Sequence, residues 1–296
     1  MSILLSGCGG GYDVFCTIPL FFEYQKKKKN IIVVSLSFTK VRLLEKLAIE
    51  NQIEKLKSNL YFVDARKMVN REYDYFPEYY LSRHLQQGVY VIIIKQSTIK
   101  QITEAYNVII HKKNIIKFYL VDGGCDLLLS GKESDLATPV EDMMHLKAVV
   151  NLPIKRKYAC AVGMTCDCNS VPKNELLDRL KEIEDILISK HIWSLTDPYV
   201  KKYYDIFYKS KPTNSIVNSL ICSTLEGRVG YYLPKHLKLR IRNNNVELDQ
   251  LMITFVQYDL IKLSNRILYL DELDINHDID EIDDYIMNFN RNILNL

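Results

Sequence analysis

The stretch SILLSGCGGGYDVF, Ser2 to Phe15, decides the fold of this chain of 296 residues. Its first part, Ser2 to Gly7, is a short apolar run of the kind that forms a buried strand. Four glycines fall between Gly7 and Gly11 and allow a sharp turn, and a helical pattern begins at about Tyr12. A strand, a glycine-rich turn and a helix in this order are typical of the first unit of an α/β sheet.

Similar apolar runs alternate with helical patterns through the first half of the chain. The expected strands are Ser2–Gly7, Asn30–Ser37, Leu60–Ala65, Val89–Ile94, Ile115–Gly124 and Tyr158–Gly163. The expected helices are Tyr12–Lys28, Val41–Lys57, Ser97–Lys113 and a segment that ends near Val150. Strands that are apolar throughout and separated by helices fit a parallel sheet covered on both faces. The pattern predicts a doubly wound, mostly parallel, Rossmann-like α/β sheet.

The rest of the chain gives a weaker pattern. Residues 174–190 carry apolar residues on one helical face, and 237–249 resemble a hairpin that turns at 243–245. Residues 251–267 fit a helix or a strand equally, and 278–296 fit a helix. Because no repeat or long linker separates the parts, we expect a core of residues 1–172 with a helical and hairpin extension, 173–296, packed on it as one domain.

Composition narrows the classes of function. The chain is 48% hydrophobic and 25% charged, as in ordinary folded soluble proteins, and its net charge of +3 gives little reason to expect nucleic acid as a partner. No apolar run approaches the roughly 20 residues of a membrane span, and the run before Cys8 is too short for a lipoprotein signal. Seven scattered cysteines indicate reduced thiols in a cytoplasmic protein rather than disulfides or a zinc site. The sequence is also compatible with a homo-oligomer.

The glycine loop after the first strand is the first candidate site, because ligands of doubly wound sheets bind at the carboxyl ends of the strands. Its amides can bind a phosphate or a carboxylate, so we expect ligand contacts from Gly7, Cys8, Gly9, Gly10, Gly11 and Tyr12. The bulky Tyr12 departs from the dinucleotide-binding fingerprint, where a third glycine is usual. Asp13 either caps the following helix or contacts the ligand.

Two later loops repeat the pattern of strand, small residues and acid. Asp122 ends a strand, Gly123 and Gly124 turn the chain, and Asp126 follows. Asp167 comes shortly after another expected strand. Carboxylates at strand ends suit Mg²⁺, a ribose or an amine, and Asp122 and Asp126 are the expected ligands if Mg²⁺ is used. The alternative is a tight turn in which the acids accept local backbone hydrogen bonds.

The segment Thr138–Glu141 reads as a helix start. Thr138 fits the N-cap, Pro139 the first helical position and Glu141 the acid of a capping box, which removes Glu141 from the catalytic candidates. Asp142 and His145 are three residues apart, share a helix face and can project into the cleft. The alternative for His145 is a structural hydrogen bond to a neighbouring carboxylate.

Together these segments resemble a known family. The Gly7–Val14 loop, the Val121–Asp126 turn and the Thr138–Asp142 helix start occur in the same order in the uncharacterised, largely prokaryotic family called domain of unknown function 1152. The loop Gly163–Asp167 and the segment STLEGRVG, Ser223–Gly230, are similar to its later segments. The resemblance covers most of the chain. It implies an α/β fold with glycine-rich loops and no established reaction.

From these residues we expect an intracellular enzyme that binds a small phosphate-bearing or nucleotide-like molecule. Transferase or hydrolase chemistry needs little beyond positioning and charge stabilisation by such a site. The catalytic candidates are Asp13, Asp122, Asp126, Asp142 and His145, and further ligand contacts are expected from Gly123, Gly124 and Asp167. A sensor or binding module that uses the same pocket without turnover remains the alternative, because no pair of nucleophile and base is identifiable.

Overall fold

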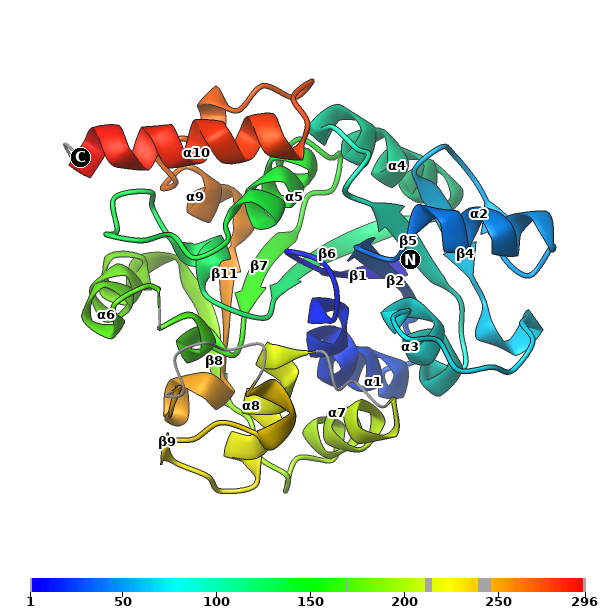
Figure 1. Ribbon diagram of the computed structural model, residues 1–296, viewed down its shortest axis with the longest axis horizontal. Coiled ribbons are helices and arrows are strands. Elements are labelled where there is room, and N and C mark those ends of the chain that lie inside the picture. The colour runs from blue at the N-terminus through cyan, green and yellow to red at the C-terminus, as the bar shows by residue number, and fades with distance from the viewer. Residues whose placement is uncertain (1, 169, 211–214, 239–245, 295–296) are drawn as a thin grey trace.

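A computed structural model describes residues 2–168, 170–210, 215–238 and 246–294. A sheet of nine strands, in the order β3-β4-β5-β2-β1-β6-β7-β11-β8, runs through the middle of the molecule (Figure 1). Its strands are β1 (Ser2–Gly7), β2 (Asn30–Ser37), β3 (Glu54–Lys55), β4 (Leu60–Val63), β5 (Val89–Ile93), β6 (Ile115–Asp122), β7 (Lys157–Ala161), β8 (Leu187–Ile192) and β11 (Thr254–Asp259). A separate antiparallel pair joins β9 (Gly230–Tyr231) and β10 (Glu247–Leu248).

The sheet is mixed but mostly parallel. The five central strands, β5, β2, β1, β6 and β7, are parallel to one another, whereas β3, β4, β11 and β8 add to the sheet in antiparallel pairings. All six residues of β1 are buried. This agrees with an apolar run that is covered on both faces. The predicted α/β class is confirmed.

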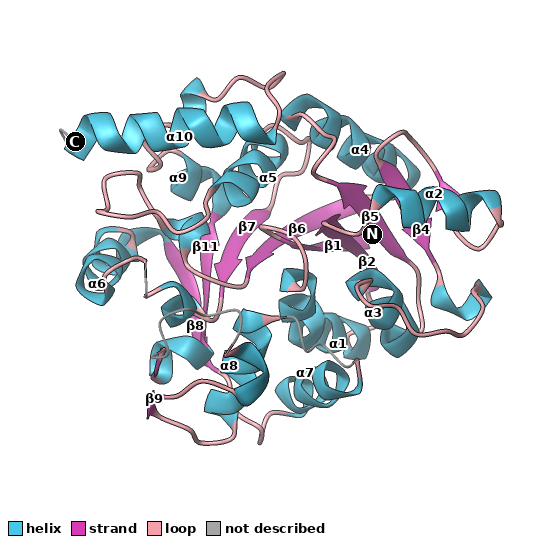
Figure 2. Cartoon of the chain, in the orientation of Figure 1, coloured by secondary structure: helices cyan, strands magenta, loops and turns pink. Residues whose placement is uncertain are grey.

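Helices cover both faces of the sheet (Figure 2). They are α1 (Ile18–Lys26), α2 (Val41–Ile49), α3 (Pro77–Leu85), α4 (Ile99–Lys112), α5 (Val140–Val150), α6 (Lys173–Glu182), α7 (Pro198–Lys209), α8 (Ile216–Leu225), α9 (Leu260–Ser264) and α10 (Ile279–Leu294). Leu4 and Ile32 belong to the core under α4, α5, α9 and α10, while Ile3 and Ile31 face α1, α7 and α8. Neighbouring strand residues thus serve opposite cores, as the alternation of side chains along a strand requires.

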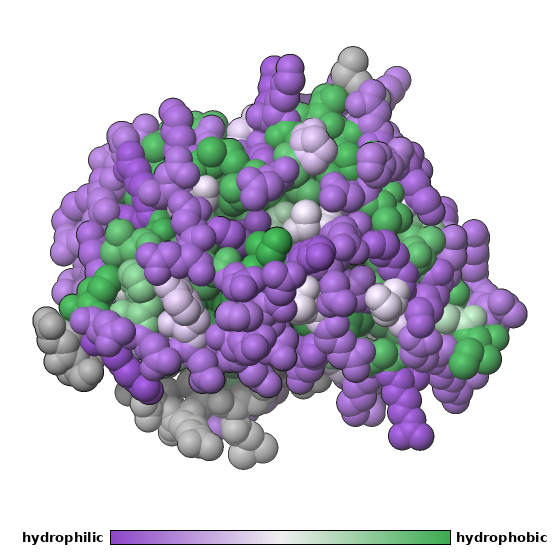
Figure 3. Space-filling view, turned by 90° about the horizontal axis from the view of Figure 1, so that it is seen from above, coloured by the Kyte–Doolittle hydropathy of each residue, from purple (hydrophilic) through white to green (hydrophobic). Residues whose placement is uncertain are grey.

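One face of the molecule shows mainly polar side chains (Figure 3). On the face seen in Figure 3, hydrophilic residues form most of the surface and hydrophobic residues lie in small, separate patches. Among the described residues no helix is both long enough and apolar enough to cross a membrane.

The strand order places a topological switch point between β1 and β6. From β1 the chain proceeds to β2 and later to β5 on one side, and β6 then pairs with the other edge of β1. The loops that follow β1 and β6 therefore leave the sheet in different directions and leave a crevice between them. The glycine loop and the Asp122 turn lie at this crevice.

Several expectations for the C-terminal part need correction. The predicted helix 174–190 is wrong in its second half, because α6 ends at Glu182 and β8 begins at Leu187. Pairing with β11 decides the conformation there, and tertiary contacts of this kind override local helical spacing. The ambiguous segment 251–267 contains both a strand, β11, and a helix, α9. The predicted C-terminal helix is confirmed as α10.

The expected hairpin at 237–249 falls largely outside the described residues, which include neither its turn at 243–245 nor 239–242. At the first end of the expected hairpin, Leu237 is the last residue of a short 3-10 turn. At the second end, β10 pairs with β9 and not with residues near Leu237. The first long helix is also shorter than expected, because Asp13–Thr17 forms a 3-10 turn, η1, before α1 begins at Ile18.

Candidate functional site

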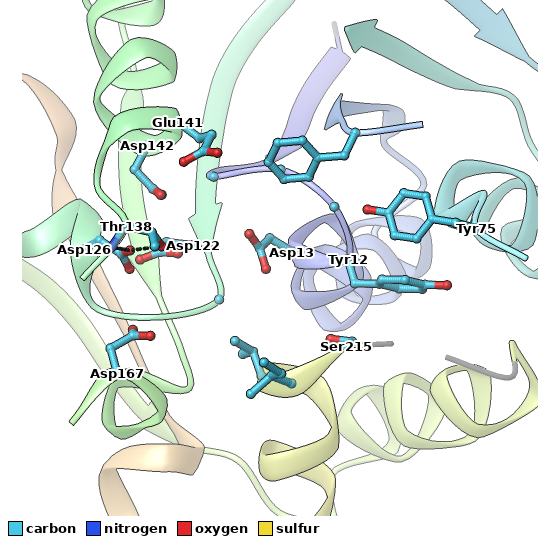
Figure 4. A pocket seen from close by; sticks show the side chains of 17 residues that line it. Tyr12, Asp13, Tyr75, Asp122, Asp126, Thr138, Glu141, Asp142, Asp167 and Ser215 are labelled. Carbon is cyan, nitrogen blue, oxygen red and sulfur yellow. Dashed lines mark hydrogen bonds between the residues drawn. The ribbon is translucent and has the colours of Figure 1, made fainter. Parts of the chain in front are cut away.

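A cavity of about 350 Å³ opens at the carboxyl ends of the central strands (Figure 4). Its walls come from the loops after β1, β2 and β6, the start of α5, the turn after β7 and the start of α8. The lining residues are Gly9, Gly10, Gly11, Tyr12, Asp13, Phe38, Tyr75, Asp122, Gly123, Asp126, Thr138, Glu141, Asp142, Asp167, Ser215, Ile216 and Val217. Six of these carry a carboxyl group, and none is Lys, Arg or His.

The glycine loop forms one wall of the cavity. Gly9, Gly10 and Gly11 have φ angles of +73°, +105° and +65°. Residues other than glycine rarely adopt this backbone conformation. The ring of Phe38 lies against Gly10, where a Cβ atom would be 2.8 Å from Cε2 of that ring. Among the described residues no hydrogen bond uses the N–H groups of Gly9, Gly10 or Gly11. Three successive amides are left for a ligand.

The carboxylates reach the cavity from several strand ends. Asp122 is the last residue of β6, Asp126 begins the short turn η3 (Asp126–Leu128), and Asp142 lies in the first turn of α5. One carboxylate oxygen from each of these three lies within 4.8 Å of the other two. Asp167 ends the turn η4 (Met164–Asp167) after β7. Asp13, at the start of η1, lies between this group and the tyrosines in Figure 4.

These carboxylates differ in the hydrogen bonds that they accept from the protein. Oδ2 of Asp126 accepts from the amide and the hydroxyl of Thr138, at 3.2 and 3.1 Å. Asp167 accepts from the amide of Cys125 at 3.0 Å, and Asp122 accepts a longer bond from a backbone amide. Oδ1 of Asp142 is buried and has no hydrogen-bond partner among the described residues. Among the described residues, it is the one carboxylate oxygen of the cluster that is both fully buried and without a hydrogen-bond partner.

Burial and mutual repulsion raise the pKa values of the cluster. For Asp13, Asp122 and Asp142, loss of hydration raises the pKa of the carboxyl well above its usual range, and neighbouring carboxylates raise it further. The same causes raise the pKa of Asp167 to about 8. The pKa of Glu141 rises to about 6, again chiefly through burial. The site is thus a concentration of acidic groups, and no cationic side chain among the described residues of the lining offsets them.

The other end of the cavity is aromatic. The rings of Tyr12 and Tyr75 meet edge to face with centroids 5.7 Å apart, and Figure 4 shows both on the side away from Asp122 and Asp142. Phe38 adds a third ring to the lining. A cavity with carboxylates at one end and rings at the other can hold a ligand that is polar at one end and planar at the other.

Most of the predicted site residues do converge on this cavity. Those that line it are Gly9, Gly10, Gly11, Tyr12, Asp13, Asp122, Gly123, Asp126, Asp142 and Asp167. Gly7 and Gly124 lie behind it. A Cβ atom at Gly7 would be 2.3 Å from the backbone of η1, and one at Gly124 would be 2.7 Å from Oδ2 of Asp167. These two glycines allow close packing rather than line the cavity.

Cys8 and His145 do not reach the cavity. Both are fully buried. Burial and the nearby carboxylates raise the pKa of the Cys8 thiol, so the position does not favour a reactive thiolate. His145 points into the core, where Nε2 bonds the hydroxyl of Tyr106, and burial lowers its pKa to about 3. The expectation that His145 projects into the cleft with Asp142 is therefore corrected, and its structural partner is a tyrosine, not a carboxylate.

The predicted capping box at Thr138 is wrong. The helix α5 begins at Val140, and its N-cap position, Pro139, makes no side-chain cap. The hydroxyl of Thr138 instead donates to Asp126, so the buried carboxylate competes successfully for it. Glu141, which the capping box would have occupied, lines the cavity.

Comparison with known proteins adds a family. The model of a family described as a protein of unknown function, DUF1152, matches residues 4–288. The chain belongs to the DUF1152 family. No curated protein and no solved structure matches it.

Sequence reasoning missed part of the site of this DUF1152 protein. Phe38 directly follows β2, so the rule that ligands bind at the carboxyl ends of strands would have pointed to it. Tyr75 comes from an irregular tyrosine-rich segment, and Ser215, Ile216 and Val217 belong to the start of α8, about 200 residues after the glycine loop. Nothing in their local sequence indicates that they line the cavity.

The cysteines of this DUF1152 protein provide no metal site in the part of the chain that the structure describes. There, the group formed by Asp122, Asp126 and Asp142 is the one set of acid, His or Cys side chains close enough to share an ion. Cys160 and Cys166 are buried free thiols, as expected for core and loop residues.

Proposed function

We propose that this DUF1152 protein is an intracellular enzyme of hydrolase or transferase type. Its substrate is a small phosphate-bearing, nucleotide-like molecule, bound together with a divalent cation. The observation that carries the proposal is the meeting of three unused glycine amides with a cluster of buried carboxylates in one cavity at the switch point of the sheet.

The amides suit the anionic part of such a ligand. Successive N–H groups in a turn can form a concavity in which phosphate oxygens accept hydrogen bonds. Gly9, Gly10 and Gly11 line the cavity, and among the described residues their N–H groups make no hydrogen bond. Their lack of side chains lets a phosphate approach the backbone closely.

The carboxylates require a counter-charge. A bare phosphate would be disfavoured by six acidic side chains, and none of the described residues that line the cavity is a Lys, Arg or His that could attract it. A divalent cation resolves the conflict, because it binds carboxylate and phosphate oxygens at the same time. Binding of ligand and cation should therefore be cooperative.

The aromatic end suits the rest of a nucleotide-like ligand. Tyr12, Tyr75 and Phe38 offer ring faces and edges on which a planar base can pack. The volume, about 350 Å³, is in the range of pockets that take ligands of this size.

The chemistry that fits this site is transfer of a phosphoryl group. The bond from phosphorus to the leaving-group oxygen breaks, and a new bond forms from phosphorus to the oxygen of water or of an acceptor alcohol. The proton of the attacking group passes to a carboxylate, and the leaving oxygen takes up a proton from solvent. Asp13 suits the role of base, because it lines the cavity and accepts no hydrogen bond among the described residues.

The test compares thermal unfolding with Mg²⁺ alone, a panel of nucleotides and sugar phosphates alone, and each compound with Mg²⁺. A ligand at about a hundred times its dissociation constant adds about 2.7 kcal/mol, which is a rise of a few degrees for a chain of this size. We expect Mg²⁺ alone to stabilise the protein through its own site, and a further rise of this size only when compound and Mg²⁺ are both present. Asp126→Asn should abolish it, and Asp178→Asn, an exposed change on α6, should not.

Turnover then separates an enzyme from a sensor. The stabilising compound is incubated with protein and Mg²⁺ and examined by phosphorus NMR and mass spectrometry. Release of phosphate or formation of a transfer product supports the proposal. A compound that binds with Mg²⁺ and returns unchanged would favour a ligand sensor, and a panel with no stabilising member would remove the proposal's main support.

A further inference from the structure

We propose that Asp122, Asp126 and Asp142 bind one small divalent cation of the Mg²⁺ or Mn²⁺ class. Each offers a carboxylate oxygen, and the three oxygens lie within 4.8 Å of one another. Around an ion with metal–oxygen distances of about 2.1 Å, opposite ligands are about 4.2 Å apart. Small side-chain rotations would bring the three oxygens to one ion.

A second observation points to a ligand at the same place. Asp142 is only 4% exposed, yet its Oδ1 has no hydrogen-bond partner among the described residues. An unsatisfied buried polar atom is costly, and a buried carboxylate oxygen more so. Asp142 lies beside Asp122 and Asp126 and lines the cavity. A cation shared with Asp122 and Asp126 would supply the missing partner.

The supporting contacts hold the other two ligands in place. The amide and hydroxyl of Thr138 both donate to Oδ2 of Asp126 and fix the orientation of this carboxylate. Asp122 accepts from the amide of Leu127 through Oδ2, which leaves its Oδ1 for the ion. Hydrogen bonds of this kind orient metal-ligating carboxylates.

The nature of the donors selects the ion. All three ligands are carboxylate oxygens, which favour hard cations over Zn²⁺ or Cu²⁺. Three protein ligands leave about half of an octahedral shell for water or phosphate oxygens, an arrangement usual for Mg²⁺ and less so for Ca²⁺, which takes more protein oxygens. The ion would therefore keep open positions toward the cavity.

This inference rests on the pocket of the proposed function and deepens it, because it names the ion through which a phosphate would bind. The two can nevertheless fail separately. Cation binding is measured on the protein alone, without any phosphate compound. A bound ion with no phosphorylated substrate would leave the inference standing and overturn the proposed function.

The experiment is a Mn²⁺ titration of the metal-free full-length protein, followed by the electron paramagnetic resonance signal of free Mn²⁺. We expect one tight site, from which Mg²⁺ displaces Mn²⁺. Asp142→Asn keeps the shape of the side chain and should weaken Mn²⁺ binding by about 100-fold, because it removes a charged ligand. Asp167→Asn is the matched control, since it removes a carboxylate from the same cavity but outside the three. It should weaken binding by no more than about 5-fold.

Several outcomes would overturn the assignment. Absence of stoichiometric Mn²⁺ binding would do so, as would equal losses in the two variants, which would indicate diffuse attraction by the cluster. Unchanged binding in Asp142→Asn would also contradict it. Thermal unfolding of both variants in chelator verifies that each is folded, and Asp122→Asn provides an independent second removal of a ligand if Asp142→Asn does not fold.

Discussion

Two buried carboxylates in this protein have opposite surroundings. Glu78, in the first turn of α3, is fully buried and accepts hydrogen bonds from Ser35 at 2.8 Å and from Thr39 at 2.9 Å. Asp142, in the first turn of α5, is 4% exposed, and one of its oxygens has no partner among the described residues. Both occupy helix N-termini, where the helix dipole favours negative charge. The difference lies in the donors around them.

That difference separates a structural carboxylate from a binding one. Burial raises the pKa of Glu78, but bonds from serine and threonine hydroxyls act against the rise. Burial also raises the pKa of Asp142, and the neighbouring Asp126 and Asp13 add to the rise. A fold that only needed a charge at the start of α5 would have surrounded it with donors, as it does at α3. The lack of a donor at Oδ1 of Asp142, among the described residues, suits a position that binds a ligand.

The largest effect we expect is a contrast in stability between variants of these two residues. Glu78→Ala should lower the free energy of unfolding by about 3 kcal/mol or more, because it leaves the hydroxyls of Ser35 and Thr39 buried without an acceptor and opens a cavity. Asp142→Asn should raise it by about 1 kcal/mol in chelator, because repulsion within the cluster falls. Urea unfolding at pH 7.5 measures both. If Asp142→Asn lowered the free energy of unfolding as much as Glu78→Ala does, Asp142 would be a structural residue and not a ligand-binding one.

The second prediction concerns pH and the metal-free protein. The pKa of Asp167 in the folded state is about 8, above its usual 3.8, so between these values the folded state holds a proton that the unfolded state has lost. Stability must therefore fall as pH rises through this range. Each such proton contributes about 1.4 kcal/mol per pH unit, so we expect a loss of about 2 kcal/mol between pH 6.5 and 8.

Asp167→Asn tests the origin of this slope. The variant should show a clearly shallower fall over the same range, measured by urea unfolding in chelator. His145 adds little there, because its folded pKa of about 3 and its usual pKa of 6.5 both lie at or below the lower limit. Stability that rises with pH between 6.5 and 8 would contradict the account of a repulsive cluster.

Much of this site follows from sequence because its elements are local. A strand, glycines and an acid recur after β1 and β6, and parallel strands bring their carboxyl ends to one edge. This is why Asp13, Asp122 and Asp126 could be placed together in advance. The turn after β7 added Asp167 by the same argument.

The errors arise where a distant partner decides the outcome. Thr138 has the sequence of a helix cap, but Asp126 takes its hydroxyl, and Glu141 is left in the cavity. His145 shares a helix with Asp142, but positions three apart differ by about 60° around the helix axis, and His145 contacts Tyr106 in the core. The aromatic wall depends on Tyr75, whose place follows from how its segment packs rather than from any periodicity. Such competition between local and tertiary partners is not visible in a single sequence.

The smallest predicted effect on stability gives a sharp test of the cavity wall. Gly9 and Gly227 both have left-handed backbone, with φ of +73° and +89°. A Cβ atom at Gly9 would lie 2.7 Å from Oδ2 of Asp142 and 3.1 Å from Oδ2 of Asp13, whereas one at Gly227 would meet nothing within 4 Å. Gly9→Ala and Gly227→Ala should each lower the free energy of unfolding by about 1 kcal/mol, because both introduce the same backbone strain.

Only Gly9→Ala should also lose Mn²⁺ affinity, by about 10-fold or more, because the methyl group displaces the Asp142 carboxylate from its position beside Asp122 and Asp126. The two variants are compared by urea unfolding and by Mn²⁺ titration. Equal stability with unequal Mn²⁺ binding would show that the unsatisfied carboxylate depends on the glycine loop for its position. Unchanged Mn²⁺ binding in Gly9→Ala would mean that Asp142 can move without consequence, and the contrast with the firmly bonded Glu78 would then lose its functional meaning.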